Sequence, residues 1–179
     1  MKATSLKTYV RAAMLLPAMI LISQVGRAQD STLPDSDIVG TLKSLGTYTW
    51  MLSVIERTGL TESLRYDGPF TLFAPTDDAV AALGSDPVES MSNEELLALL
   101  RYHILTDVIS QENAIALGTL FTAQGATINA EIDERGVRIN DATVVTPDIK
   151  AGNGLIHSID GVLIPPKSIE GIAGTNGAP

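Results

Sequence analysis

The chain has 179 residues, enough for one domain with an apolar core and short for two. Its formal net charge of −9 excludes nucleic acids and anionic lipid surfaces as natural partners, because like charges repel. There is no cysteine, so disulfide bonds, thiol catalysis and cysteine-ligated metals are excluded, and the core has to hold the fold unaided.

Residues 1–28 have the features of a secretory signal peptide. Basic residues stand near the start, an apolar run covers 12–25, and small residues precede a cleavage site after Ala28. The run has 14 residues and contains Pro17, whereas a membrane-spanning helix needs about 20 apolar residues. We therefore expect cleavage after Ala28, no stable membrane span, and a secreted protein that is extracellular or periplasmic.

Three further segments follow the predicted signal peptide. A linker covers 29–35, a folded region covers 36–166, and a tail rich in glycine and alanine covers 167–179 and is expected to be flexible. Residues 1–28 carry four basic residues and no acidic one, so 8 basic and 21 acidic residues remain, a net charge of −13. This charge favours solubility outside the cell and partners with basic surfaces.

Apolar residues at helical spacing predict helices over 36–45 and 48–57, the second ending at Gly59. A short strand at 70–73 is then followed by another helix. We expect Thr76 to cap this helix and Asp77 to lie in its first turn, where negative charge is stabilised. A metal site or an acid/base pair at these carboxylates is the alternative, and capping explains them with fewer assumptions.

A further helix is predicted over 92–105, where Ser92 and Glu95 have the spacing of a capping box. His103 shares a helical face with the apolar residues before it and is expected to point inward, beside Tyr102. A buried histidine needs hydrogen-bond partners, and a tyrosine hydroxyl or a backbone carbonyl would serve.

From Val108 on, short runs rich in β-branched residues predict strands. Alternation in the last run places His157 on an apolar face. Helices in the first half and a mostly antiparallel sheet in the second predict an α+β fold. The expected strands lie at 118–125, 126–132, 136–140, 142–149 and 154–164.

Three stretches resemble the motifs of the fasciclin domain family, in family order and at similar spacing: TLFAPTDDAVAAL at 71–83, LLRYHIL at 99–105 and NGLIHSIDGVLIPP at 153–166. The resemblance covers roughly residues 36–166. It implies a β-wedge with the N-terminal helices packed against it, and an extracellular adhesion module that is not an enzyme. The residues that match the signature motifs are Thr76, Asp77, Asn153, Gly154, His157 and Asp160.

The resemblance also implies candidate contact residues. Adhesion by animal members involves the Tyr-His motif, matched by Tyr102 and His103, and an Asp-Ile pair, matched by Asp148 and Ile149. Lys150 stands where the family usually has an apolar residue, and the compact leader is typical of bacteria, where integrins are not native partners. Tyr102 and His103 could instead bridge helix and sheet, while an exposed Asp148–Ile149 segment beside a flexible turn could bind directly.

Two other functions remain open from the residues. One is a carrier of an apolar small molecule in a groove between the helices and the wedge. The other is a hydrolase or metalloenzyme, with His157 assisted by His103 and Asp77 or Asp160. No G-x-S-x-G or H-E-x-x-H motif supports an enzyme. We therefore expect no catalytic residue, metal or cofactor, and a protein or glycan of a cell surface or biofilm matrix as partner. Self-association would add avidity to a single weak site.

Overall fold

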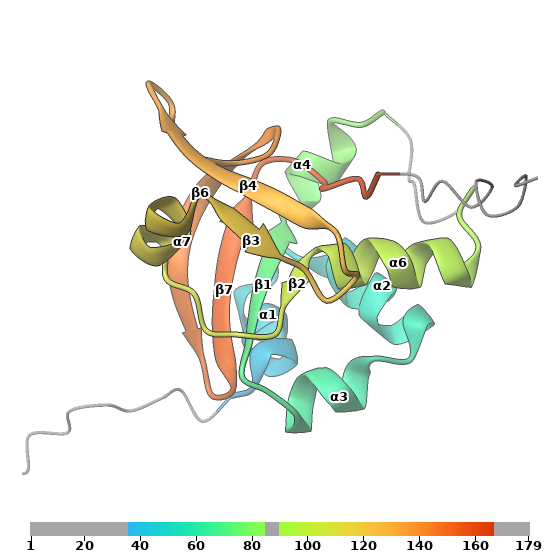
Figure 1. Ribbon diagram of the computed structural model, residues 1–179. Coiled ribbons are helices and arrows are strands. Elements are labelled where there is room, and N and C mark those ends of the chain that lie inside the picture. Colours follow the sequence, from blue (N-terminus) through green and yellow to red (C-terminus); the bar gives the residue numbers. More distant parts are fainter. Residues whose placement is uncertain (1–35, 85–89, 167–179) are drawn as a thin grey trace, which may run out of the picture. The chain divides into compact units, whose positions relative to one another are not determined.

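A computed structural model describes residues 36–84 and 90–166 of the chain (Figure 1). The expected signal peptide (1–28), linker (29–35) and tail (167–179) lie outside the described residues. The helices are α1 (Ile38–Leu45), α2 (Thr49–Thr58), α3 (Thr61–Tyr66), α4 (Asp77–Ala81), α6 (Asn93–Tyr102) and α7 (Gln111–Leu117). The strands are β1 (Phe70–Pro75), β2 (Ile104–Leu105), β3 (Thr119–Phe121), β4 (Thr127–Asp133), β5 (Gly136–Ile139), β6 (Ala142–Ala151) and β7 (Gly154–Ile159).

The strands form one seven-stranded sheet in the order β2-β1-β7-β6-β5-β4-β3. All neighbours are antiparallel except β1 and β7, which run parallel. The sheet curves so far that the Ala123 amide, just after β3, donates to the Ile104 carbonyl of β2 at 2.7 Å. The expected α+β fold with a mostly antiparallel wedge is confirmed.

The parallel pair at the centre is buried on both faces, as strands covered from both sides usually are. Leu72 of β1 lies opposite Ile156 of β7, and Phe73 lies opposite His157. Successive side chains point to opposite faces, so these two pairs enter different cores. The ladder therefore separates two apolar clusters and belongs to both.

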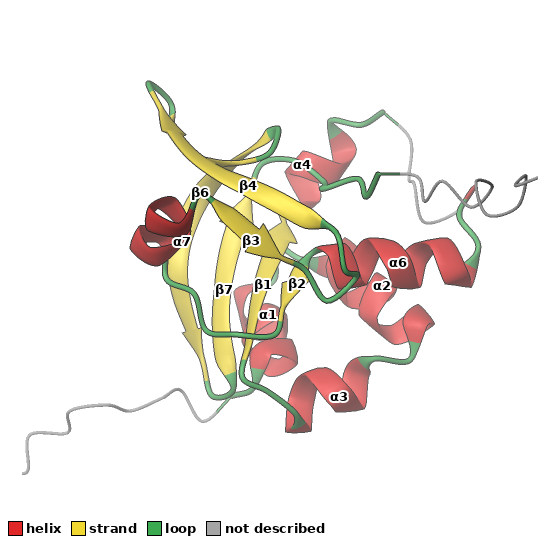
Figure 2. Ribbon diagram, viewed as in Figure 1, coloured by secondary structure: helices red, strands yellow, loops and turns green. Residues whose placement is uncertain are grey.

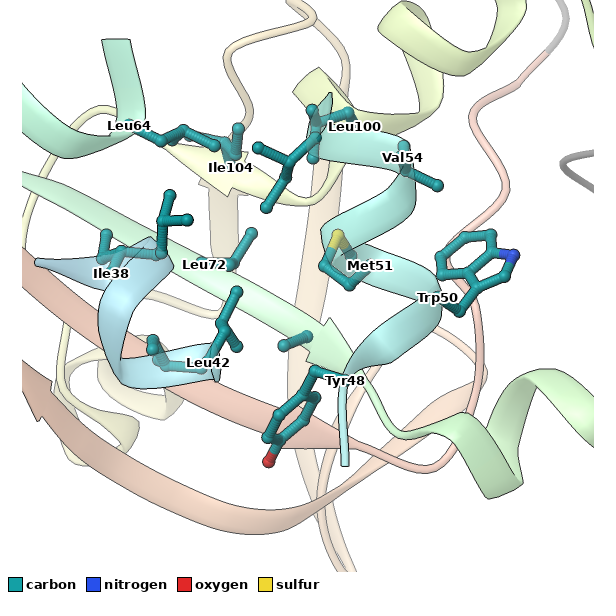
Figure 3. Packing of buried hydrophobic residues seen from close by; sticks show 14 of the residues in the cluster. Ile38, Leu42, Tyr48, Trp50, Met51, Val54, Leu64, Leu72, Leu100 and Ile104 are labelled. Atoms are coloured by element: carbon teal, nitrogen blue, oxygen red, sulfur yellow. The ribbon is translucent and has the colours of Figure 1, made fainter. Parts of the chain in front are cut away.

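The first core lies between the central strands and the helices α1, α2, α3 and α6, which gather on one side of the strands in Figure 2. Side chains of helix and strand meet around Leu72, Met51 and Leu100 (Figure 3). The second core lies within the curve of the sheet and includes Phe73, Tyr102 and Ile159. Because side chains alternate between the two faces of β1 and β7, these two strands contribute residues to both cores.

Several boundaries differ from the sequence-based expectations. Helix α6 stops at Tyr102, because the chain turns there into the short strand β2. The last strand ends at Ile159 and not at residue 164. The helices α3 and α7 were not expected, since each has fewer than eight residues and such helices depend on tertiary contacts. The capping box of Ser92 and Glu95 is confirmed.

Candidate partner-binding site

Asp77 holds two helices in place. Thr76 caps α4 as expected, with its hydroxyl accepting the Ala79 amide at 3.1 Å. The Asp77 carboxylate lies in the first turn of α4 but caps α2, accepting the amides of Thr49 at 3.1 Å and Trp50 at 3.0 Å. Partial burial alone raises the pKa of Asp77, and these hydrogen bonds outweigh it, so the pKa lies below its usual value.

Asn153 ties the tip of the β6–β7 hairpin to two helices. Its Oδ1 accepts the Ile38 amide at the start of α1, at 2.9 Å. Its Nδ2 donates to the carbonyls of Leu64, at 2.8 Å, and Asp67, at 2.9 Å, around the end of α3. The turn at 152–154, expected to be flexible, is therefore a fixed hairpin turn.

Gly154 and Asp160 complete the second signature motif. A Cβ on Gly154 would lie 2.0 Å from the Phe70 carbonyl oxygen, so β1 can approach β7 only at a glycine. Asp160 accepts the Thr143 amide at 2.6 Å, and its own amide donates to the Thr143 carbonyl at 3.0 Å. Both residues join backbone segments of the sheet.

Tyr102 is 3% exposed and lies in the second core. Its hydroxyl donates to the Thr127 carbonyl at 3.1 Å and accepts from the Asn140 side-chain amide at 3.1 Å. The phenol thus joins α6 to β4 and to the turn after β5.

His103 is fully buried, as its helical position suggested. Its Nε2 accepts the Leu163 amide at 3.0 Å, so the proton sits on Nδ1, which donates to the Leu99 carbonyl at 2.8 Å. Burial lowers the pKa of His103 to about 4, against the opposing effect of the Leu99 hydrogen bond. The ring is neutral at physiological pH and attaches the chain after β7 to α6.

His157 is bonded in the opposite tautomer. Its Nδ1 accepts the Asp148 amide at 3.2 Å, and its Nε2 donates to the Ile109 carbonyl at 2.8 Å. The ring stacks on Phe73 with a centroid distance of 5.3 Å. Burial lowers the pKa of His157. With both nitrogens engaged in each ring, neither histidine offers a lone pair to a metal or a substrate.

Asp148 and Ile149 are held differently. Asp148 is exposed, has a φ of +54° and lies where the β6–β7 register shifts. Its carboxylate accepts the Gln111 amide at 3.0 Å, at the start of α7. Ile149 was expected to be exposed, and this is wrong: strand alternation turns it inward, where it is half-buried against the first core.

The exposed surface around Asp148 is larger than the sequence suggested. β5 pairs with β6 at Ala142 and Thr143, and β6 then continues to Ala151 beside β7. The exposed residues of this stretch, named here the β6 edge, are Val145, Thr146, Pro147, Asp148 and Lys150. Val145 is 59% exposed, as alternation from the buried Ala142 predicts, but Thr146 is also exposed, although the same alternation would turn it inward.

Two features of the described residues bear on the metal-site and carrier alternatives. Within 36–84 and 90–166, no three His, Asp or Glu side chains are grouped so that they could hold a metal ion. A pocket among the described residues, lined by Phe73, His157 and residues of α7, β5 and β6, is too narrow to admit a small organic ligand. None of the described helices is long and apolar enough to span a membrane.

Comparison with known proteins identifies the class. A family model for the fasciclin domain matches residues 46–165, and the chain belongs to this family. Among its relatives, Protein sll1483 of Synechocystis is 35% identical over 124 residues, 67% of this chain and 68% of that protein. Transforming growth factor-beta-induced protein ig-h3 of Sus scrofa is 31% identical over 137 residues, 75% of this chain and 20% of that protein.

A solved structure supports the fold. It is the FAS1 domain pair from the insect cell adhesion molecule Fasciclin I, with a TM-score of 0.62 and 19% identity. The match covers 74% of this chain and 52% of the other. At this identity the likeness shows the shared fold.

Proposed function

We propose that this protein is a secreted fasciclin-domain protein that acts outside the cell, or in the periplasm, as an adhesion or interaction module. Its membership of the fasciclin family supports this function, as does the description of a structural relative as a cell adhesion molecule. The observation that carries the proposal is the β6 edge, an exposed strand segment whose backbone is held in one shape around Asp148.

The proposed contact is the β6 edge and not the Tyr-His motif. Tyr102 and His103 are buried, and their polar atoms are bonded within the domain. A partner could reach them only by opening the second core. Asp148 and Lys150 are exposed on one strand, and the exposed Val145 and Pro147 precede them on that strand. This surface offers one carboxylate, one ammonium group and a small apolar patch.

The partner is a protein or glycan of a cell surface or extracellular matrix. Charges of both signs on the β6 edge suit a polar partner, while the acidic domain favours one with basic groups. A contact of five exposed residues is small, so we expect weak single binding. Dense display or self-association would then supply the avidity that attachment needs.

The test is attachment of beads coated with the protein to the producing cells and to their matrix. Asp148→Asn removes the charge, keeps an acceptor for the Gln111 amide, and tolerates a positive φ. Val145→Ser removes the exposed apolar group. Both variants are expected to weaken attachment while remaining folded by circular dichroism. Leu117→Ser, at the exposed end of α7, is the matched control and is expected to bind like wild type.

Attachment that is equal for wild type and both β6-edge variants would reject this surface as the contact. Secretion is tested separately by cell fractionation and N-terminal sequencing. We expect the exported protein to begin at Gln29, after cleavage following Ala28. A protein that stays in the cytoplasm with residues 1–28 attached would contradict the secretion part of the proposal.

A further inference from the structure

His157 is the ionisable side chain that holds the backbone of the proposed contact. Its Nδ1 accepts the Asp148 amide, and its Nε2 donates to the Ile109 carbonyl, just before α7. The Asp148 amide can only donate, so Nδ1 must be unprotonated for this bond to exist. The hydrogen bond therefore depends on the charge state of the ring.

Asp148 needs this support. Its φ of +54° is uncommon for a residue other than glycine, and the register of β6 and β7 shifts between Thr146 and Ile149. Pro147 precedes it and has no amide to contribute to the sheet. Two hydrogen bonds described above fix the residue, one from its amide to His157 and one to its carboxylate from Gln111.

Protonation of His157 would replace an acceptor with a donor. Two N–H groups would then face each other where the Asp148 amide now meets Nδ1. The Asp148 carboxylate lies beside the ring and attracts its positive form, raising the pKa of His157 against the effect of burial. Protonation therefore removes the acceptor of the Asp148 amide, one of the two bonds that fix Asp148.

The pocket around the His157 ring is lined by uncharged side chains. Its neighbours in the pocket under α7 are apolar side chains and Gln111. β1 has no ionisable side chain, and β7 has none besides His157. The remaining charged residues of the packed elements are Asp107 before α7, Glu112 on α7, Arg138 on β5 and Lys150 on β6. Asp148 is the one charge among these elements that acts on the ring.

We infer that His157 couples the β6 edge to pH, so that protonation of its ring releases the Asp148 bulge and weakens partner binding in mild acid. This inference rests on the proposed function, since it concerns the same contact. It predicts a module that attaches at neutral pH and detaches on acidification, without unfolding of the domain.

The structural half of the inference is tested without a partner. Nuclear magnetic resonance on the wild-type protein follows the His157 ring and the Asp148 amide between pH 7.5 and 5. We expect both to change with one midpoint, below 6.5, the value of an unperturbed histidine. The amide's protection from hydrogen exchange should fall about five- to tenfold, as expected for one lost hydrogen bond.

The variant His157→Asn separates this mechanism from general acid effects. Its Oδ1 can take the place of Nδ1 as an acceptor and does not titrate. We expect the Asp148 amide to lose its pH-dependent change, and bead attachment to be equal at pH 7.5 and 5.5. His103→Gln alters the other buried histidine and keeps an acceptor for the Leu163 amide. Attachment by this variant should depend on pH as wild-type attachment does.

The outcomes are distinct. If the His157 ring titrates and the Asp148 amide does not respond, or if attachment by His157→Asn still falls in acid, the coupling is rejected while the adhesion function stands. If ring and amide titrate together but wild type attaches to nothing at any pH, the adhesion function fails and the coupled bulge remains. Loss of attachment in wild type alone, with matching midpoints, supports the inference.

Discussion

The carboxylate of Asp77 accepts the backbone amide of Trp50, 27 residues earlier in the chain, at 3.0 Å. Helix α2 begins after Tyr48, whose side chain makes no capping bond, so the cap comes from another helix. One carboxylate thus fixes the start of α2 while lying in the first turn of α4. This link explains an acid at position 77 better than a metal or acid/base role.

Asp77→Ala is expected to destabilise the domain by about 1–2 kcal/mol, the usual range for loss of a helix cap. Urea unfolding followed by circular dichroism measures the change. Asp78→Ala alters the exposed neighbour and should stay within about 0.5 kcal/mol of wild type. Equal losses for the two variants would contradict the capping role. Because the folded pKa of Asp77 is lowered, its contribution is present above pH 3.8 and is lost as pH falls below that value.

The two buried histidines predict a loss of stability in mild acid. The folded pKa of His103 is about 4 against 6.5 for the free side chain, so the unfolded chain binds the proton first as pH falls. The free energy of unfolding should drop by about 2 kcal/mol between pH 7.5 and 5 through His103 alone.

Urea unfolding at these two pH values tests this. His103→Gln should be less stable than wild type at pH 7.5 and lose less on acidification. His157, whose pKa is also lowered, adds to the loss of stability of wild type in acid, and this contribution remains in the variant. A wild type equally stable at both pH values would show that the rings are not buried and neutral as described.

Gly154→Ala is expected to destabilise the domain by more than about 3 kcal/mol, because the new Cβ would overlap the Phe70 carbonyl. The contact is with backbone, so no side chain can move aside. Gly161→Ala is the matched control, since its Cβ would lie 3.2 Å from the Ala142 Cβ, and should lose about 1 kcal/mol. Thermal unfolding of both variants is the measurement. A much larger loss for Gly154→Ala supports the close approach of Phe70, and equal losses would indicate a general intolerance of glycine substitution.

Tyr102→Phe separates a structural role from a contact role for the Tyr-His motif. Removing the hydroxyl leaves the Asn140 amide and the Thr127 carbonyl without this partner, and we expect a loss of about 1–2 kcal/mol. Attachment of the folded variant should equal wild type. Tyr66→Phe, at a tyrosine that is 74% exposed, should change neither property. Lost attachment by a folded Tyr102→Phe protein would place the contact at this motif.

The sequence predicts the elements that have local causes. The capping box at Ser92 and the inward face of His103 follow from spacing along one helix. The hydrogen bonds between Asp77 and Trp50 and between Asn153 and Leu64 could not be predicted. They join segments that are far apart in the sequence and that only the fold brings together. A side-chain type suggests that a cap exists but does not say which helix it serves.

The errors around α7 and β6 have the same origin. Helix α7 has seven residues and is held at its start by Ser110 and by Asp148 from the sheet. Ile149 was expected to be exposed because a proline before it and glycines after it suggested a loop. The segment is instead a strand, and pairing of Ile149 with Ile156 of β7 turns its side chain inward.

The parallel pairing of β1 with β7 determines when, during synthesis, this chain can complete its fold. Of the strands that the structure describes, the first, β1, has the last, β7, as its neighbour, and Leu72 and Phe73 of β1 each meet a β7 side chain in one of the two cores. A fragment that ends before Gly154 therefore lacks Ile156 from the first core and Ile159 from the second. Synthesis must reach β7 before the central ladder can close, so the complete domain can form only late in synthesis.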